Sequence, residues 1–115
     1  MSDAMYPSTT QEAAQKRRDL SPATEEAFQA FSQKVFAEGV LSIRMKQLMA
    51  VAVAHVTQCP YCIKGHTKAA LGQGASREEL MEAIWVAAEM RAGGAYAHSI
   101  LAIQEMDTAA QAKSA

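Results

Sequence analysis

The sequence predicts an all-α fold: a compact helical domain of five or more helices with a central antiparallel helical hairpin. Alanine, leucine, methionine, glutamate, glutamine and lysine are common, and these residues have the highest helix propensities. The chain has 3 prolines, and each stands where a helix would begin or end. No stretch shows the sustained alternation of apolar and polar residues that a half-buried strand needs, so no strand is expected.

The first half of the chain predicts two helices. Ser21-Pro22 is typical of an N-cap followed by proline in the first turn, and the helix that it begins should end at Gly39. Ser42 is the expected N-cap of a second helix that runs to about Gln58. Residues 48–54 in its middle are apolar all round, which indicates a buried helix.

The second half predicts three more helices. Pro60 cannot continue the preceding helix but suits the first turn of the next, which should run to about Leu71. Ser76 and Glu79 have the spacing of a capping box and begin a fourth helix. The pair Gly93-Gly94 is expected to break it, and a fifth helix should cover residues 95–106.

These elements form one expected domain over residues 21–107, preceded by a polar, partly flexible segment (1–20) and followed by a flexible tail (108–115). A chain of 115 residues is small for a stable core, and oligomerisation is a common remedy. We therefore expect a homo-oligomer.

Composition excludes several classes of function. The net charge of -1 provides no basic excess for a nucleic acid. The longest apolar run, residues 48–54, is far shorter than the roughly 20 residues that span a bilayer. With no apolar signal core near the N-terminus, a cytoplasmic location is expected, where two cysteines are seldom a structural staple.

The strongest motif is Cys59-Pro60-Tyr61-Cys62. A helix that begins at Pro60 would place both sulfurs at its N-terminus, where the helix dipole and free N–H groups favour thiolates. A pair with this spacing can alternate between dithiol and disulfide. A thioredoxin fold would need βαβ units, which this chain lacks.

Two histidines share helix faces with the cysteines. His66 lies four residues after Cys62, so it can stabilise the thiolate or accept its proton, and His55 has the same relation to Cys59. The same four residues also offer two thiolates and two imidazoles to a zinc ion, which leaves a zinc-binding structural module as an alternative.

The combination of motifs is more specific than the cysteines alone. The segments that carry a family resemblance are residues 45–54, 59–66, 69, 74–80, 82–83 and 90–94. They resemble the alkylhydroperoxidase D-like branch of the carboxymuconolactone decarboxylase family. The resemblance implies an all-helical trimer or hexamer that reduces alkyl hydroperoxides or hydrogen peroxide.

The resemblance also implies roles for individual residues. The second cysteine, here Cys62, would attack the peroxide, Cys59 would resolve the product, and His66 matches the family histidine. Gln47 and Tyr61 are supporting residues. The redox-active disulfide would replace any cofactor, and a lipoyl or thioredoxin-like protein would be the dithiol reductant. Cys62 is expected to have the lower pKa or the closer base.

One position departs from the family pattern. The acidic residue expected twelve positions before the first cysteine is Gln47, and a glutamine cannot act as a general base. Either His55 takes over this role or peroxidase activity is weak, so the sequence predicts a measurable effect of His55→Ala and little effect of Gln47→Ala. Glu82 and Glu89 are further candidates for the site.

Two other functions remain open at this point. The decarboxylase branch of the family uses histidine chemistry and lacks the cysteine pair, so the pair favours the redox branch. A redox sensor or scaffold, in which the disulfide forms but turnover is negligible, would contain the same motif.

Overall fold

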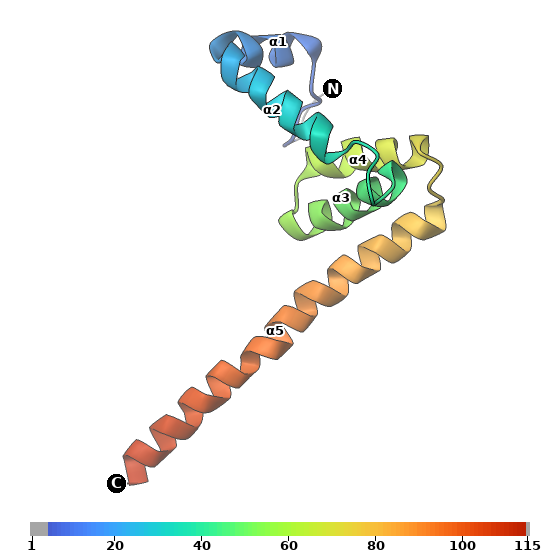
Figure 1. Cartoon of the computed structure of the whole chain (residues 1–115). Helices are drawn as coiled ribbons and strands as arrows, with labels where there is room; N and C mark the ends of the chain where they lie inside the picture. Colours follow the sequence, from blue (N-terminus) through green and yellow to red (C-terminus); the bar gives the residue numbers. More distant parts are fainter. Residues whose placement is uncertain (1–4, 115) are drawn as a thin grey trace.

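The structure is a computed structural model that describes residues 5–114. It contains five helices and, within the described residues, no strand, which confirms the all-α prediction (Figure 1). The helices are α1 (Gln11–Leu20), α2 (Pro22–Val35), α3 (Ile43–Thr57), α4 (Pro60–Gly72) and α5 (Arg77–Ser114).

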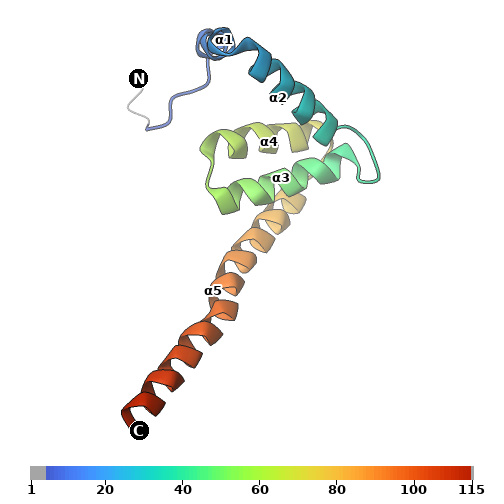
Figure 2. The ribbon, with the colours of Figure 1, turned by 60° about the vertical axis from the view of Figure 1, so that its left-hand side comes forward.

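The centre of the fold is the antiparallel hairpin of α3 and α4, with the first part of α5 packed on α3 (Figure 2). Its core is small and includes several alanines. The buried core residues are Leu48, Val51, Ala70, Ala75 and Leu80, with Ala83 and Ile84 packed against them. Arg91 of α5 also donates to the backbone carbonyl of Val56 at 2.8 Å, which ties α5 to the C-terminal end of α3.

The expected caps account for two of the helix starts. The Ser42 hydroxyl accepts from the Met45 N–H at 3.1 Å at the start of α3. Before α5, the Ser76 hydroxyl accepts from the Glu79 N–H at 3.0 Å, and the Glu79 carboxylate accepts from the Ser76 N–H at 2.9 Å. This reciprocal pair is the predicted capping box. Glu79 also forms an ion pair with Arg44, which links α5 to α3.

Both ends of the chain are more helical than predicted. Residues 11–20, expected within a polar and partly flexible segment, form α1, because the Thr10 hydroxyl accepts from the Ala13 N–H at 3.1 Å and caps the helix. Residues 108–114, expected as a flexible tail, continue α5.

The predicted break at Gly93-Gly94 is wrong, because α5 runs through both glycines. Glycine costs only about 1 kcal/mol relative to alanine inside a helix. The flanking residues are mostly strong helix formers, and no proline follows. Two glycines are therefore insufficient to end this helix.

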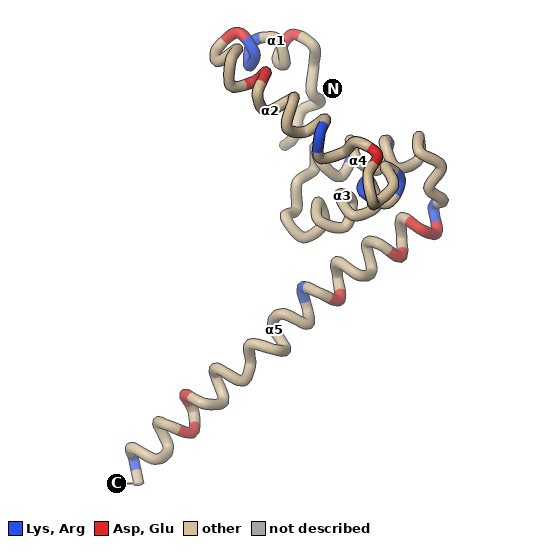
Figure 3. Tube along the Cα trace, viewed as in Figure 1, with Lys and Arg blue, Asp and Glu red and all other residues tan. Residues whose placement is uncertain are grey.

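Burial of residues 48–54 is also one-sided rather than complete. Val51 is fully buried, whereas Met49 and Val53 are 49% and 58% exposed. The whole chain is extended, with a radius of gyration of 20.7 Å, against about 13 Å for a compact chain of this length. The second half of α5 projects from the body, and charged residues are sparse along it (Figure 3). Within residues 5–114, no helix has the length and apolar character required to cross a membrane.

Candidate active site

The connection between α3 and α4 positions the cysteine pair. Gln58 adopts the left-handed conformation (φ 58°, ψ 49°), and the following Cys59 N–H donates to the Ala54 carbonyl at 3.2 Å. The chain thus reverses direction within two residues. Cys59 becomes the N-cap of α4, and Pro60 occupies the first turn.

The two cysteines are free thiols with different environments. Cys59 Sγ accepts from the Cys62 backbone N–H at 3.2 Å. Hydrogen bonds from the Cys62 thiol and then from the Cys62 backbone lower the pKa of Cys59. The same thiol–thiol hydrogen bond, followed by burial, raises the pKa of Cys62. Of the two alternatives predicted for Cys62, the lower pKa falls on Cys59 instead, because the Cys62 hydrogen bonds favour the Cys59 thiolate. That Cys62 has the closer base stays a prediction.

His66 is held by Gln47, a residue whose substitution was predicted from the sequence to have little effect. Its Nδ1 lies 2.7 Å from Oε1 of Gln47, whose side chain is buried. An amide oxygen only accepts hydrogen bonds. Nδ1 therefore carries the ring proton and donates a hydrogen bond to Gln47. In the neutral ring, Nε2 is then unprotonated and can accept a proton.

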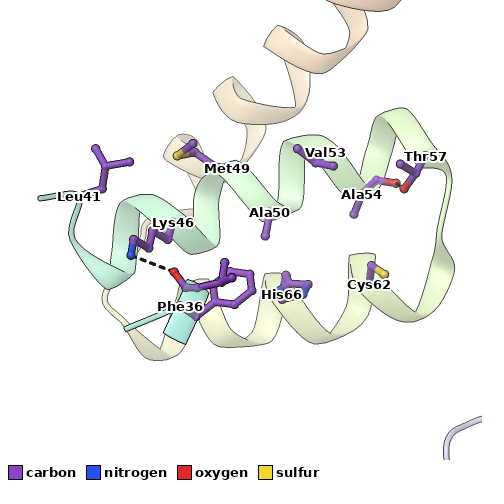
Figure 4. A pocket seen from close by; sticks show the side chains of 11 residues that line it. Phe36, Leu41, Lys46, Met49, Ala50, Val53, Ala54, Thr57, Cys62 and His66 are labelled. Carbon is purple, nitrogen blue, oxygen red and sulfur yellow. Dashed lines mark hydrogen bonds between the residues drawn. The ribbon is translucent and has the colours of Figure 1, made fainter. Parts of the chain in front are cut away.

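Phe36, at the end of α2, stacks on the His66 ring with centroids 5.1 Å apart and an interplanar angle of 25°. Lys46 secures this end of the helix, because its Nζ donates to the carbonyls of Val35 at 2.9 Å and Ala37 at 2.7 Å. Figure 4 shows Phe36 next to His66, which lies on α4, with Cys62 further along the same helix. The Lys46 clamp and the Phe36 stack fix one face of the imidazole.

Two cavities meet at this site. The first is an apolar groove of about 460 Å³ between the end of α2, one face of α3, and α4. The residues that line this apolar groove are Val35, Phe36, Leu41, Lys46, Met49, Ala50, Val53, Ala54, Thr57, Cys62 and His66. The second cavity, of about 540 Å³, is lined in part by Gln47 and Tyr61. Cys62 and His66 line both cavities, whereas Cys59 lines neither.

Tyr61, between the cysteines, is 45% exposed and meets the N-terminal segment. Its ring packs edge-on against Tyr6, with centroids 6.1 Å apart. Tyr61 therefore lies at the rim of the second cavity and contributes to its wall.

The structure does not bring every candidate to the site. Nδ1 of His55 lies 2.8 Å from the Val51 carbonyl of its own helix, and His55 lines neither cavity. Glu82 and Glu89 are exposed on α5 and also line neither. Among residues 5–114, no three histidine, cysteine or acidic side chains gather as metal ligands.

Two residues of the site were not singled out from the sequence. Phe36 reaches His66 from a different helix, and no local spacing relates the two positions. Lys46 is one residue before Gln47, but its partners are carbonyls at the end of α2. Only the tertiary arrangement shows that both residues support the imidazole.

The fold and the site define an all-helical protein that presents a Cys-x-x-Cys pair at a helix N-terminus beside a histidine. The model of the carboxymuconolactone decarboxylase family matches residues 22–105, and the chain belongs to this family. This confirms the family resemblance found in the sequence.

Several individual proteins are also similar to this chain, and one of them is described as a member of the same family. The chain is 52% identical over 107 residues to "uncharacterized protein 4 in cox locus" of Paracoccus denitrificans, covering 93% of this chain and 96% of that protein. A carboxymuconolactone decarboxylase family protein from Legionella pneumophila has a similar structure, with a TM-score of 0.64 and 34% identity over 67% of this chain and 69% of that chain. A protein from Methanobacterium thermoautotrophicum gives a TM-score of 0.69 and 36% identity, over 72% of this chain and 93% of that chain.

Proposed function

We propose that this protein is a thiol-dependent peroxidase, a disulfide oxidoreductase that reduces hydroperoxides through the Cys59–Cys62 pair. The observation that carries the proposal is that Cys62 and His66 line both cavities while Cys59 lies behind Cys62 as the N-cap. A substrate that reaches the wall shared by the two cavities thus meets a thiol and an imidazole together. This arrangement supports the alkylhydroperoxidase D-like assignment over the histidine-only decarboxylase branch.

The hydrogen-bonded thiol pair behaves as one titrating unit. In its singly ionised form Cys59 is the thiolate and Cys62 the thiol. Cys62 must lose its proton before it can attack, and two groups are the proposed bases: the Cys59 thiolate, which is hydrogen-bonded to the Cys62 thiol, and Nε2 of His66, which lines the same cavities. Gln47 assists by keeping the proton of the neutral imidazole on Nδ1.

The proposed cycle has three balanced steps. The Cys62 thiolate attacks the terminal peroxide oxygen, the O–O bond breaks, and one proton goes to the leaving alkoxide, which gives an alcohol and a Cys62 sulfenic acid. The Cys59 thiolate then attacks this sulfur and releases water, after one proton transfer, to form the disulfide. An external dithiol reduces the disulfide by thiol–disulfide exchange.

The regeneration step suits the position of Cys59. A thiolate of lower pKa is the better leaving group when an external thiol attacks a disulfide, so attack at Cys62 would release Cys59. A lipoyl or thioredoxin-like protein has the required chemistry. We also propose that the protein works as a homo-oligomer, a trimer or hexamer, as its family resemblance implies.

A steady-state assay tests the proposal. Consumption of cumene hydroperoxide and of hydrogen peroxide is measured with a regenerating dithiol, for the native protein and for Cys62→Ser, Cys59→Ser and His66→Ala. Sustained turnover that Cys62→Ser abolishes supports the peroxidase. Disulfide formation without turnover, under several dithiols, would instead indicate a redox sensor, and stoichiometric zinc in the purified protein would favour the structural alternative.

A further inference from the structure

The second half of α5 is a helix without a partner in its own chain. Every residue from 95 to 114 is exposed, and Figures 1 and 2 show this part leaving the body of the protein. Residues 92–104 contain no Asp, Glu, Lys or Arg. Large side chains in this region include Tyr96, Ile100, Leu101 and Ile103, each about half exposed or more. A helix of this composition normally lies against another apolar surface.

The exposed surface of the chain is large enough to require such a partner. Its accessible area is 9268 Å², whereas a compact protein of 12.4 kDa would expose about 6,100 Å². The excess of roughly 3,000 Å² is several times the about 800 Å² that each partner buries in a standard protein interface.

The apolar groove beside Cys62 is the complementary surface. Its lining is mostly apolar, and the ammonium of Lys46, its one charged residue with His66 neutral, is already engaged by two backbone carbonyls. Met49 and Val53 in its wall are half exposed. The stretch of α3 along the groove, residues 46–57, is about 17 Å long, and residues 96–106 of α5 are about 15 Å long.

We propose that the occupant of the apolar groove is residues 96–106 of α5 from a second copy of this chain. A nearly uncharged helix of matching length would cover Met49 and Val53, and its single charged side chain, Glu105, lies in the last turn, where it can reach solvent. The same contact would close the groove from solvent over Cys62 and His66. The second copy therefore completes the site, and the isolated chain has an incomplete one.

Glycines 93 and 94 agree with this assignment. The atoms nearest to a Cβ at Gly93 would belong to the Glu89 side chain of the same helix, and a Cβ at Gly94 would contact nothing within 4 Å. Contacts within the chain therefore do not explain why glycine stands at either position, although each glycine weakens the helix. A second helix that crosses α5 closely at this point would use the space that they leave.

Accessibility of Cys62 and the mass of the assembly test the proposal together. In Cys59→Ser the only thiol is Cys62, so its rate of alkylation by iodoacetamide reports how far this sulfur is exposed through the groove and the second cavity together. Ile100→Asp places a charge within the uncharged segment, and Gln111→Asp places the same charge on the same helix beyond it. Sedimentation gives the mass, and far-UV circular dichroism confirms that the helices persist.

The parent protein should be oligomeric and its Cys62 protected. Ile100→Asp should dissociate it and raise the alkylation rate about tenfold or more, the factor that loss of about 1.4 kcal/mol of protecting contacts gives. Gln111→Asp should match the parent. A monomeric parent, an unchanged mass of Ile100→Asp, or dissociation without faster alkylation would each overturn the proposal.

Disulfide trapping gives a second readout that does not depend on a charged variant. Single cysteines replace Tyr96, Ile100 or Ile103 in the Cys59→Ser background, with Gln111→Cys as the matched control. Oxidation should link at least one of the three to Cys62 of another copy, mapped by peptide mass spectrometry. No link above the control at all three positions would overturn the proposal. Neither readout uses peroxide, so failure of the proposed activity would not affect them.

Discussion

The hydrogen bond between Gln47 and His66 leads to a prediction that differs from the one made from the sequence: removing the Gln47 amide should slow the chemical step. Gln47→Leu keeps a similar volume but removes the acceptor for the Nδ1 proton, 2.7 Å away in a buried setting. Loss of a neutral hydrogen bond costs about 0.5–1.5 kcal/mol, and a buried donor left unsatisfied costs about 1–3 kcal/mol. If about 1–2 kcal/mol of this appears in the transition state, attack by Cys62 slows roughly 5- to 30-fold.

The measurement uses Cys59→Ser, so that the reaction stops at the Cys62 sulfenic acid. Stopped-flow rates with a hydroperoxide are compared between this single-cysteine parent and the same protein carrying Gln47→Leu. Nitrogen NMR of the imidazole should show a protonated Nδ1 in the parent and lose this preference in Gln47→Leu. Gln73→Leu, the same substitution at an exposed position that lines neither cavity, is the matched control.

The charged variant provides the complementary test. Gln47→Glu places a carboxylate against the Nδ1 proton and favours the doubly protonated ring, which leaves Nε2 without a lone pair. The rise of the attack rate with pH should therefore move to higher pH than in the parent. Unchanged rates and an unchanged tautomer in Gln47→Leu would refute the positioning role of the amide.

Three further predictions concern the same region. Cys59 should be alkylated at lower pH than Cys62, because its pKa is lowered by the Cys62 hydrogen bonds while that of Cys62 is raised; peptide mapping of alkylation against pH that gives the reverse order would contradict this. Gln58→Gly should raise the free energy of unfolding in urea by about 1 kcal/mol, because glycine adopts the left-handed conformation without strain; a lower stability would contradict it. His55→Ala should leave the rate of peroxide attack within about twofold, since a residue outside the cavities supplies no acid–base catalysis; a large loss would show that His55 reaches the site.

The sequence predicted the local features of the fold well. The boundaries of α3 and α4 and the capping box before α5 depend on proline, serine and glutamate within a few residues of each helix end. Such signals act through neighbouring atoms, so one sequence suffices to locate them. The helix through Gly93-Gly94 was missed because its continuation depends on the summed propensity of many flanking residues.

The candidate site was predictable only where its residues share a helix. Cys62 and His66 are related by helical spacing, and Cys59 by the N-cap position. The same spacing argument suggested His55, but the direction in which α3 faces α4 and α5 decides which side chains meet the cysteines. The amide of Gln47 and the ring of Phe36 reach His66 from other helices, so their contacts depend on tertiary packing.

The central claim is that Cys62 reacts with peroxide and Cys59 resolves the product. Intact-protein mass spectrometry after one equivalent of cumene hydroperoxide tests it most directly, on the reduced protein and on the two single cysteine variants. The account predicts a loss of two hydrogens in the parent, gain of one oxygen at Cys62 in Cys59→Ser, and no reaction in Cys62→Ser. Gain of oxygen at Cys59 in Cys62→Ser, with an inert Cys59→Ser, would contradict the account.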